Sequence, residues 1–207
     1  MTASTWFRAK DTLGIDMGQS SGRQGYHHGD ARNALAAAAG ELLEDVGAVA
    51  LSLRQVAERA GLSRQAPYNH FDDKEALLAE LARAGFERLA AKLRKVASGR
   101  SGEEALARVG EAYIGFAQAS PALFRLMFAR ELVDLSRFPA ATAASASSFA
   151  VLAAVIATMA PKDQVADRSL AAWCLIHGYA TLCNETGLES VSKRKTRAEQ
   201  FAHLFGP

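Results

Sequence analysis

Residues 63–70 hold a dense set of side chains that can bind the edges of nucleic-acid bases. Arginine can bond guanine through two donors, and glutamine or asparagine can bond adenine in the same way. Arg64 and Gln65 start this segment, and Asn69 lies about one helical turn later. Arg54 opens the preceding segment, from which it can extend to a base or a phosphate. We predict that these four residues read bases.

A second set of residues suits the phosphate backbone. Tyr68, His70 and Lys74 offer a hydroxyl, an imidazole and an ammonium group. Ser52 and Ser63 stand at predicted helix starts, where backbone N–H groups also bind phosphate. The alternative for Tyr68 and His70 is core packing with their polar tips in solvent, and the two roles are compatible.

Three short helices must position these side chains. The first is predicted from Asp30, a plausible N-cap, to Gly47, which ends it. Ser52 and Gln55 form a capping box for a second helix that ends near Ala60. The apolar stripe of the first helix recurs every three to four residues: Leu35, Ala39, Leu42, Leu43 and Val46.

The spacing after the second helix is typical of a helix-turn-helix. Ala57 is small enough for close helix approach, Gly61 suits a left-handed turn, and Leu62 can fill the gap between helices. A third helix is predicted from Arg64, capped by Ser63, to about His70; Val56 and Phe71 close the core. Pro67 falls near its first turn and is expected to keep it short. A helical hairpin with no role in DNA binding fits the same spacing.

These features together resemble the DNA-binding domain of tetracycline-repressor-like (TetR/AcrR) regulators over about residues 26–82. The resemblance implies an all-helical homodimer that binds a palindromic operator and carries an effector-binding C-terminal domain. It places Arg54, Arg64, Gln65 and Asn69 on base-reading positions, and Tyr68, His70 and Lys74 on backbone-contacting ones. The motifs that carry it are Leu51-Ser52-Leu53-Arg54-Gln55-Val56-Ala57, Ala60-Gly61-Leu62-Ser63, Tyr68-Asn69-His70-Phe71 and Lys74-Glu75-Ala76-Leu77-Leu78.

The pair Ala66-Pro67 departs from the commoner small-hydroxyl-then-Leu pair of the family. With Gly25–Asp30 and Tyr68 it resembles one subgroup, whose C-terminal domain carries a Trp…His-Gly signature. Trp173, His177 and Gly178 match that signature. The match lies outside the DNA-binding segment, so it supports the resemblance independently.

The whole chain is predicted to be all-α, with about nine helices. Residues 1–25 indicate a flexible arm, residues 26–75 the helix-turn-helix domain, and residues 76–207 an effector-binding and dimerisation domain. Asp72 and Glu75 form a box that opens the long fourth helix. This fourth helix is predicted over 73–98, with the apolar stripe Leu78, Leu81, Phe86, Leu89, Leu93 and Val96. Further helices are expected near 103–119, 121–132, 140–160, 163–186 and 195–205.

The C-terminal domain is rich in large apolar side chains, most of which must be core. Some are expected to line a pocket for a mainly apolar effector, with Tyr113 and His177 as polar handles. For His177 the alternatives are a satisfied buried histidine or a residue on a dimer face. The pocket candidates are Tyr113, Phe116, Phe124, Met127, Phe128, Phe149, Trp173 and His177.

Dimerisation is predicted through the helices at 163–186 and 195–205. Small residues around Gly178 permit close helix crossing, and the last helix has an apolar stripe too small to form its own core. The charged run at 193–195 is interpreted as a solvated loop, with a second nucleic-acid patch as the alternative.

Composition limits the other functional classes. The net charge is +2, and residues 1–75 hold eight Lys and Arg against ten Asp and Glu, so a nucleic-acid role must depend on local charge placement. Residues 138–161 contain no charge and predict a buried helix, with a membrane span as the alternative. Cys174 and Cys183 lie two and a half turns apart and cannot bridge, which suits a reducing cytoplasm.

Enzyme chemistry has little support in the sequence. A Cys174–His177 pair lacks a third orienting group and falls short of a zinc ligand set. His27-His28 is a weak metal site, and no Gly-rich phosphate loop occurs, so we expect no metal and no cofactor.

These observations predict a cytoplasmic, ligand-responsive transcriptional regulator, with repression as the expected sign. It would bind double-stranded operator DNA as a homodimer and respond to an unknown small molecule. The competing hypothesis is a helical enzyme or small-molecule carrier whose N-terminal helices are structural. A third is a DNA-binding protein with no effector and a filled C-terminal core.

Overall fold

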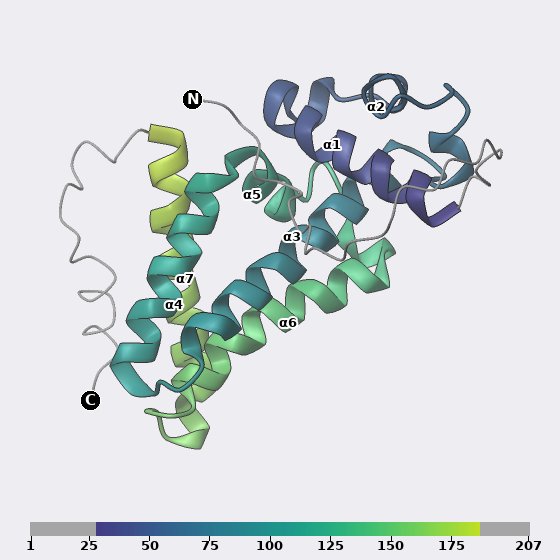
Figure 1. Ribbon diagram of the computed structural model, residues 1–207. Helices are drawn as coiled ribbons and strands as arrows, with labels where there is room; N and C mark the ends of the chain where they lie inside the picture. The colour runs from purple at the N-terminus through teal and green to yellow at the C-terminus, as the bar shows by residue number, and fades with distance from the viewer. Residues whose placement is uncertain (1–27, 187–207) are drawn as a thin grey trace, which may run out of the picture. The chain divides into compact units, whose positions relative to one another are not determined.

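The computed structural model describes residues 28–186, and within that range the chain is helical with no strand. Figure 1 shows the helices in chain order. Of the nine predicted helices, the third, over residues 64–70, is not an α-helix. The ninth, over residues 195–205, lies outside the described residues. The α-helices are α1 His28–Ala50, α2 Leu53–Arg59, α3 Lys74–Ala97, α4 Gly102–Ala119, α5 Pro121–Phe128, α6 Pro139–Ile156 and α7 Val165–Thr186.

Two compact units divide the chain between Leu77 and Leu78, inside α3. In the first unit α1 packs against α2. The helical geometry of α1 is interrupted at Gly47, which has φ 76° and ψ 165°. Left-handed φ favours glycine, so the predicted end of this helix is confirmed there. The stripe is wrong at one position, since Val46 is 44% exposed while the other four residues are buried.

Gly61 ends α2 by adopting φ 67°. The N–H of Leu62 donates to the carbonyl of Ala57 at 2.9 Å, and the N–H of Gly61 donates to that of Glu58 at 3.1 Å. These two bonds are a Schellman motif, which satisfies the last carbonyls of the helix. The turn predicted from Gly61 is therefore present.

The segment after this turn differs from the predicted helix over Arg64–His70. It contains a turn and a three-residue 3-10 helix, η1 Pro67–Asn69. The carbonyl of Ser63 accepts from Ala66 instead of from residue 67, because proline has no N–H. The following bonds keep the i to i+3 pattern: Tyr68 to Gln65 at 3.2 Å and Asn69 to Ala66 at 3.2 Å.

Ser52 caps α2 as predicted. Its hydroxyl accepts from the N–H of Gln55 at 3.3 Å and donates to that side chain's Oε1 at 2.7 Å. We expect Ser52→Ala to lower the free energy of unfolding by about 1 kcal/mol, since an N-terminal N–H loses its acceptor. Urea denaturation measures this, with Ser63→Ala as the control. An equal loss in both variants would contradict the role of the cap.

The start of α3 is shifted by one residue from the prediction. The N–H of Ala76 donates to the Asp73 carboxylate at 2.7 Å, so Asp73 rather than Asp72 caps this helix. The predicted stripe from Leu78 to Leu93 is buried, and Val96 is half-buried. This stripe provides one wall of the second unit's core.

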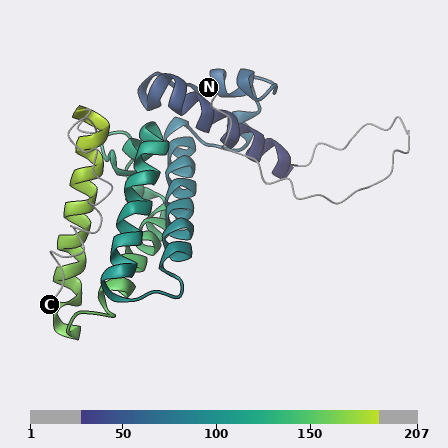
Figure 2. The same cartoon turned by 60° about the vertical axis from the view of Figure 1, so that its left-hand side comes forward.

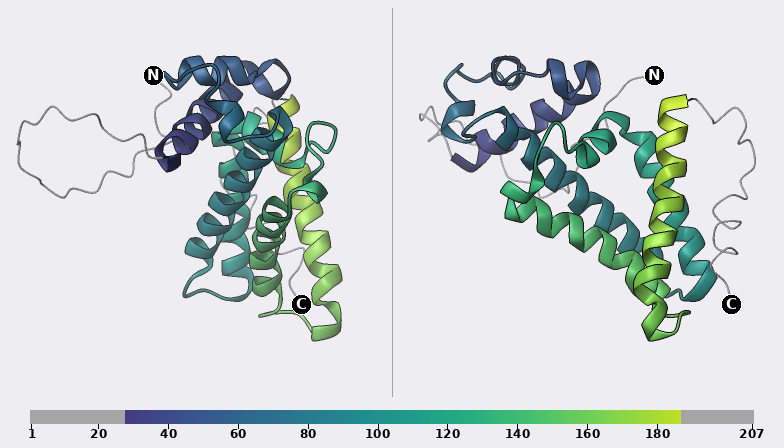
Figure 3. Two further views of the ribbon diagram at one scale, coloured as in Figure 1. Left: turned by 90° about the vertical axis from the view of Figure 1, so that its right-hand side faces the viewer. Right: turned by 180° about the vertical axis from the view of Figure 1, so that it is seen from behind.

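The second unit is a bundle in which α7 packs on both α4 and α6. Figure 2 shows α4 and α7 side by side, and both panels of Figure 3 show α6 running along α3. The side chain of Arg94 on α3 lies 3.5 Å from the Ser147 hydroxyl on α6. The core between these helices is lined mainly by aromatic and aliphatic side chains.

The uncharged helix α6 is only partly buried. One third of its residues are buried against the bundle, and its other faces expose mostly alanine and serine, so the prediction of a buried helix is only partly correct. By length and composition α6 is the one described helix that could cross a membrane, a test that core helices of soluble proteins also pass. On α7, Cys174 is exposed and Cys183 buried, both with free thiols as predicted.

Candidate nucleic-acid interface and ligand cavity

The four predicted base-reading residues are all exposed. Arg54 is the second residue of α2. Asn69 is in η1, which packs on α2, and Arg64 and Gln65 lie in the turn just before η1. Both elements therefore present their polar side chains to solvent from a shared scaffold. Buried contacts hold that scaffold from the inside: Leu35, Leu53, Val56, Ala57, Ala66, Pro67 and Phe71.

The predicted phosphate-contacting residues divide by exposure. Ser63 is exposed, as is Tyr68 at 55%, so the alternative of core packing does not describe Tyr68. Ser52, His70 and Lys74 are half-buried. Whether any of the five touches phosphate stays a prediction.

Lys74 has a structural contact that the sequence did not reveal. Its ammonium donates to the carbonyl of Val49 at 2.8 Å, which joins the start of α3 to the end of α1. An ammonium group has three donors, so this bond leaves donors for a phosphate.

Sequence reasoning missed two arginines that join elements of the first unit. Arg32 fastens residues 63–70, which we call the reading segment, to α1, and Arg59 fastens α2 to α1. The Arg32 guanidinium donates to the carbonyl of His70 at 3.1 Å and lies 4.9 Å from the centre of the Phe71 ring. Arg59 on α2 bonds Glu41 at 3.3 Å and Asp45 at 3.0 Å on α1, and the hydrogen bonds to Asp45 and Glu41 raise its pKa. Their partners lie 14 to 38 residues away, so no local pattern signals them.

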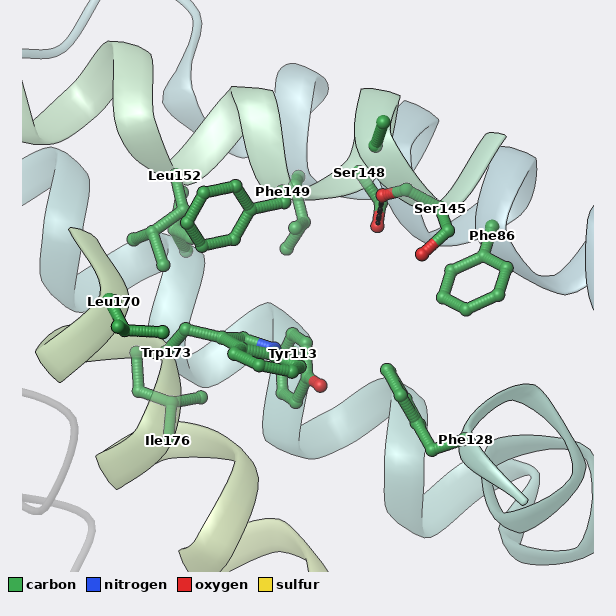
Figure 4. Close-up of a pocket in the computed structure, with 13 residues that line it drawn as sticks. Phe86, Tyr113, Phe128, Ser145, Ser148, Phe149, Leu152, Leu170, Trp173 and Ile176 are labelled. Carbon is green, nitrogen blue, oxygen red and sulfur yellow. Dashed lines mark hydrogen bonds between the residues drawn. The ribbon is translucent and has the colours of Figure 1, made fainter. Parts of the chain in front are cut away.

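The second unit contains a cavity of about 290 Å³ lined by residues of α3, α4, α5, α6 and α7. Figure 4 shows aromatic rings from different helices facing this space. Two neighbouring hollows adjoin it. One of about 610 Å³ shares five of its lining residues, Phe86, Phe128, Ser145, Ala146 and Trp173, and one of about 230 Å³ shares Phe128. The lining of the first cavity is Phe86, Leu93, Val109, Tyr113, Phe128, Ser145, Ala146, Ser148, Phe149, Leu152, Leu170, Trp173 and Ile176.

Seven of the eight predicted pocket residues line these three spaces. Phe116 does not; it is buried, and the Arg88 guanidinium lies 5.8 Å from its ring centre. Sequence reasoning missed Phe86, which it assigned to the core stripe of α3, and Ser145, which lies in a run of small residues.

Three polar side-chain groups, those of Trp173, Tyr113 and His177, are linked by hydrogen bonds among the aromatic rings of this unit. The hydroxyl of Tyr113 and Nδ1 of His177 lie 2.8 Å apart, and the phenol also bonds the Trp173 side chain. An indole N–H can only donate, so the phenol oxygen accepts from Trp173. Burial raises the pKa of Tyr113 well above its usual range and lowers the pKa of His177, so both groups are neutral at pH 7.

The lowered pKa of His177 predicts a pH dependence of stability. Protonation favours the unfolded chain, so its contribution is complete above about pH 6.5 and is lost as the pH falls from there through the folded pKa. We expect urea denaturation between pH 7.5 and 5 to show a smaller loss for His177→Gln than for the wild type. Tyr113→Phe, which keeps the imidazole, should retain the wild-type slope. Parallel pH curves for wild type and His177→Gln would contradict this.

Comparison with known proteins agrees with this architecture. Residues 35–81 match the family "Bacterial regulatory proteins, tetR family", and residues 106–205 match "Tetracyclin repressor-like, C-terminal domain". No protein of curated function matches the chain in sequence. The two family matches together span both compact units.

Solved structures are similar over most of the chain. A protein of unknown function from Rhodococcus sp. RHA1 is 30% identical, with a TM-score of 0.71, covering 88% of this chain and 94% of its own. A tetR-family regulatory protein from Rhodococcus RHA1 is 20% identical, with a TM-score of 0.64 and coverages of 84% and 94%. PfmR, a TetR-family regulator from Thermus thermophilus, is 22% identical, with a TM-score of 0.58 and coverages of 83% and 93%. The last two support the fold alone.

Members of this family are non-enzymatic transcription factors that bind DNA as homodimers and respond to small molecules. The helix-turn-helix, the cavity-bearing helical unit and the two family matches agree with one another. The chain belongs to the TetR family and is a ligand-responsive, DNA-binding transcriptional regulator.

Proposed function

We propose that this protein is a cytoplasmic repressor that binds a palindromic operator and releases it when a small, mainly apolar effector occupies the C-terminal unit. The observation that carries the DNA half is the exposure of Arg54, Arg64, Gln65 and Asn69 on two elements that pack together. Recognition elements of a dimer enter successive major grooves about 34–36 Å apart. Arg64 and Gln65, at the start of the reading segment, are assigned to base edges.

The proposed dimer uses α7 together with residues 195–205. Ala171, Leu175, Gly178 and Leu182 recur at four, three and four residues, so they share one face of α7. The side chains of Ala171, Leu175 and Leu182 are exposed, and a Cβ on Gly178 would meet nothing within 4 Å. Such a face supports close packing against a second copy.

Two small residues of α7 take no part in that proposed face. Ala172 and Ala180 are fully buried inside the single chain, so they allow close packing within the protomer rather than between protomers. The charged run at 193–195 and the arm at 1–25 lie outside the described residues.

Coupling between effector and DNA is assigned to α3. This helix begins at Lys74, beside the reading segment in the chain, and carries Phe86 into the wall of the cavity. An effector shifts the equilibrium only if it binds the two conformations with different affinity. A ligand that displaces Phe86 would supply that difference.

Selection from a random double-stranded DNA library tests the DNA half. We expect enrichment of a palindrome whose half-sites are separated by about one helical turn. A library that yields no palindrome would overturn this proposal and favour the alternative of a helical carrier or enzyme with structural N-terminal helices.

Lys74 provides a separate prediction about phosphate contact. Lys74→Met should weaken binding to the selected operator and to random DNA by similar factors, because a phosphate contact carries no sequence information. It should also reduce the slope of log affinity against log salt by about 1. Fluorescence anisotropy measures both, and Lys74→Arg, which keeps the charge, is the control. A loss confined to the operator would contradict a phosphate role.

A further inference from the structure

The cavity of about 290 Å³ has a lining that restricts the chemistry of its ligand. None of its thirteen lining residues carries a formal charge. A carboxylate placed there would lose its hydration without gaining a cation, which is unfavourable in an apolar site. Arg125 and Arg130 are exposed; each lines one of the two neighbouring hollows, and neither lines this cavity.

The walls of the cavity favour a ring. Five aromatic side chains from different helices line it, and Figure 4 shows those of Phe149, Trp173 and Phe128 around one space. The rings of Phe149 and Trp173 lie 6.1 Å apart at 81°, and those of Phe128 and Trp173 lie 6.1 Å apart at 46°. Rings held at steep mutual angles offer both faces and edges, the two surfaces that a further aromatic ring packs against.

One hydroxyl in the cavity is unused by the protein. The Ser148 hydroxyl donates to the carbonyl of Ser145 at 2.8 Å, and the Tyr113 hydroxyl is engaged with His177. The Ser145 hydroxyl has no hydrogen-bond partner among residues 28–186. Figure 4 shows it directed into the space between Phe86 and Phe128.

The hydroxyl group of a serine in a helix often donates to a backbone carbonyl of the preceding turn. The buried hydroxyl of Ser169 on α7 does so, donating to Val165 at 2.6 Å. Ser145 instead keeps its O–H available as a donor at the wall of an apolar cavity. A ligand acceptor there would gain a hydrogen bond without displacing one of the protein's own.

We propose that this cavity binds an uncharged aromatic compound of about two fused rings that carries one hydrogen-bond acceptor, and that Ser145 donates to this acceptor. The cavity volume lies at the lower end of ligand pockets, which favours a compact molecule over a long chain. The inference rests on the proposed function in treating this cavity as the effector site. It adds the chemical class of the ligand and the residue that selects it.

Three ring-matched probes and decanoate test this proposal by isothermal titration calorimetry on the full chain. The ring-matched probes are 2-acetylnaphthalene, with a carbonyl acceptor; 2-isopropenylnaphthalene, in which CH2 replaces that oxygen; and 2-naphthoate, which is charged. We expect 2-acetylnaphthalene to bind at least about tenfold more tightly than 2-naphthoate, because the buried charge has no partner. Decanoate should also bind more weakly than the ketone.

Ser145→Ala isolates the hydrogen bond. This substitution should lower the affinity for 2-acetylnaphthalene by about three- to tenfold. The affinity for 2-isopropenylnaphthalene should stay within about twofold of the wild-type value. Ser147→Ala is the matched control, since Ser147 is on the same helix and is exposed outside the cavity. This variant should bind both neutral probes with wild-type affinity. Equal effects of Ser145→Ala on the two neutral probes, tighter binding of 2-naphthoate or decanoate, or no binding of any probe would each overturn the proposal.

Release of the selected operator by 2-acetylnaphthalene is measured separately by anisotropy. If the probe binds with the predicted dependence on Ser145 while DNA stays bound, the ligand class stands and the effector role fails. If a compound releases DNA with no dependence on Ser145, the effector role stands and the ligand class fails. The two proposals therefore fail in different ways.

Discussion

Arg64→Ala is expected to weaken binding to the selected operator by about 1–3 kcal/mol per protomer and to relax base choice at one position of each half-site. The side chain is exposed at the start of the reading segment, and its guanidinium can make two hydrogen bonds to guanine. Because a homodimer contains two copies, the losses combine when the half-sites act independently. Anisotropy titrations on the operator and on single-base variants measure both effects.

The control for this experiment is Arg108→Ala on α4. Arg108 is an exposed arginine paired with Glu111 at 2.9 Å on the same helix, so its removal deletes the same charge away from the reading segment. We expect its operator affinity to stay within about twofold of wild type, the effect of a surface change. Unchanged operator affinity in Arg64→Ala would contradict the assignment of Arg64.

Phe86→Ala is expected to lower the free energy of unfolding by about 3–5 kcal/mol. Phe86 is 1% exposed, and its ring meets that of Phe128 edge-on with centres 5.4 Å apart. The substitution would enlarge a space that is already a cavity, so the surrounding side chains cannot collapse to fill it. Urea denaturation at a fixed protomer concentration measures the loss, since the stability of a dimer depends on concentration.

Phe149→Ala is the matched control, because Phe149 lines the same cavity and is 37% exposed. It removes the same atoms with less burial, so its loss should be clearly smaller than that of Phe86→Ala. A loss as large as that of Phe86→Ala would show that burial in the cavity wall does not set the stability of this unit.

Local patterns in the sequence were sufficient for most of the fold. The stripe of α3, the cap at Ser52 and the turn at Gly61 each depend on residues within a few positions of one another. Local patterns gave wrong predictions where two adjacent residues could take the same role or where a proline altered the backbone hydrogen bonds. Asp73 rather than Asp72 caps α3, and Pro67 changes the bonding of the reading segment from the α to the 3-10 pattern.

Long-range contacts account for what the sequence could not predict. Arg32 bonds a carbonyl 38 residues away, and Lys74 bonds one 25 residues away, at positions with no periodic signal. The aromatic lining of the cavity could be predicted from composition, but the role of Ser145 could not. A serine among alanines looks the same in sequence whether its hydroxyl bonds its own helix or faces a cavity.

Sequence-specific DNA binding by a dimer is tested by measuring how the full chain binds its selected operator across a salt series. A scrambled duplex of equal composition is the comparison. Fluorescence anisotropy with the label on the duplex reports both affinity and stoichiometry. We expect two protomers per operator, affinity that falls steeply with salt, and a preference over the scramble of at least about a thousandfold. Equal, weak binding to both duplexes at every salt concentration would contradict it.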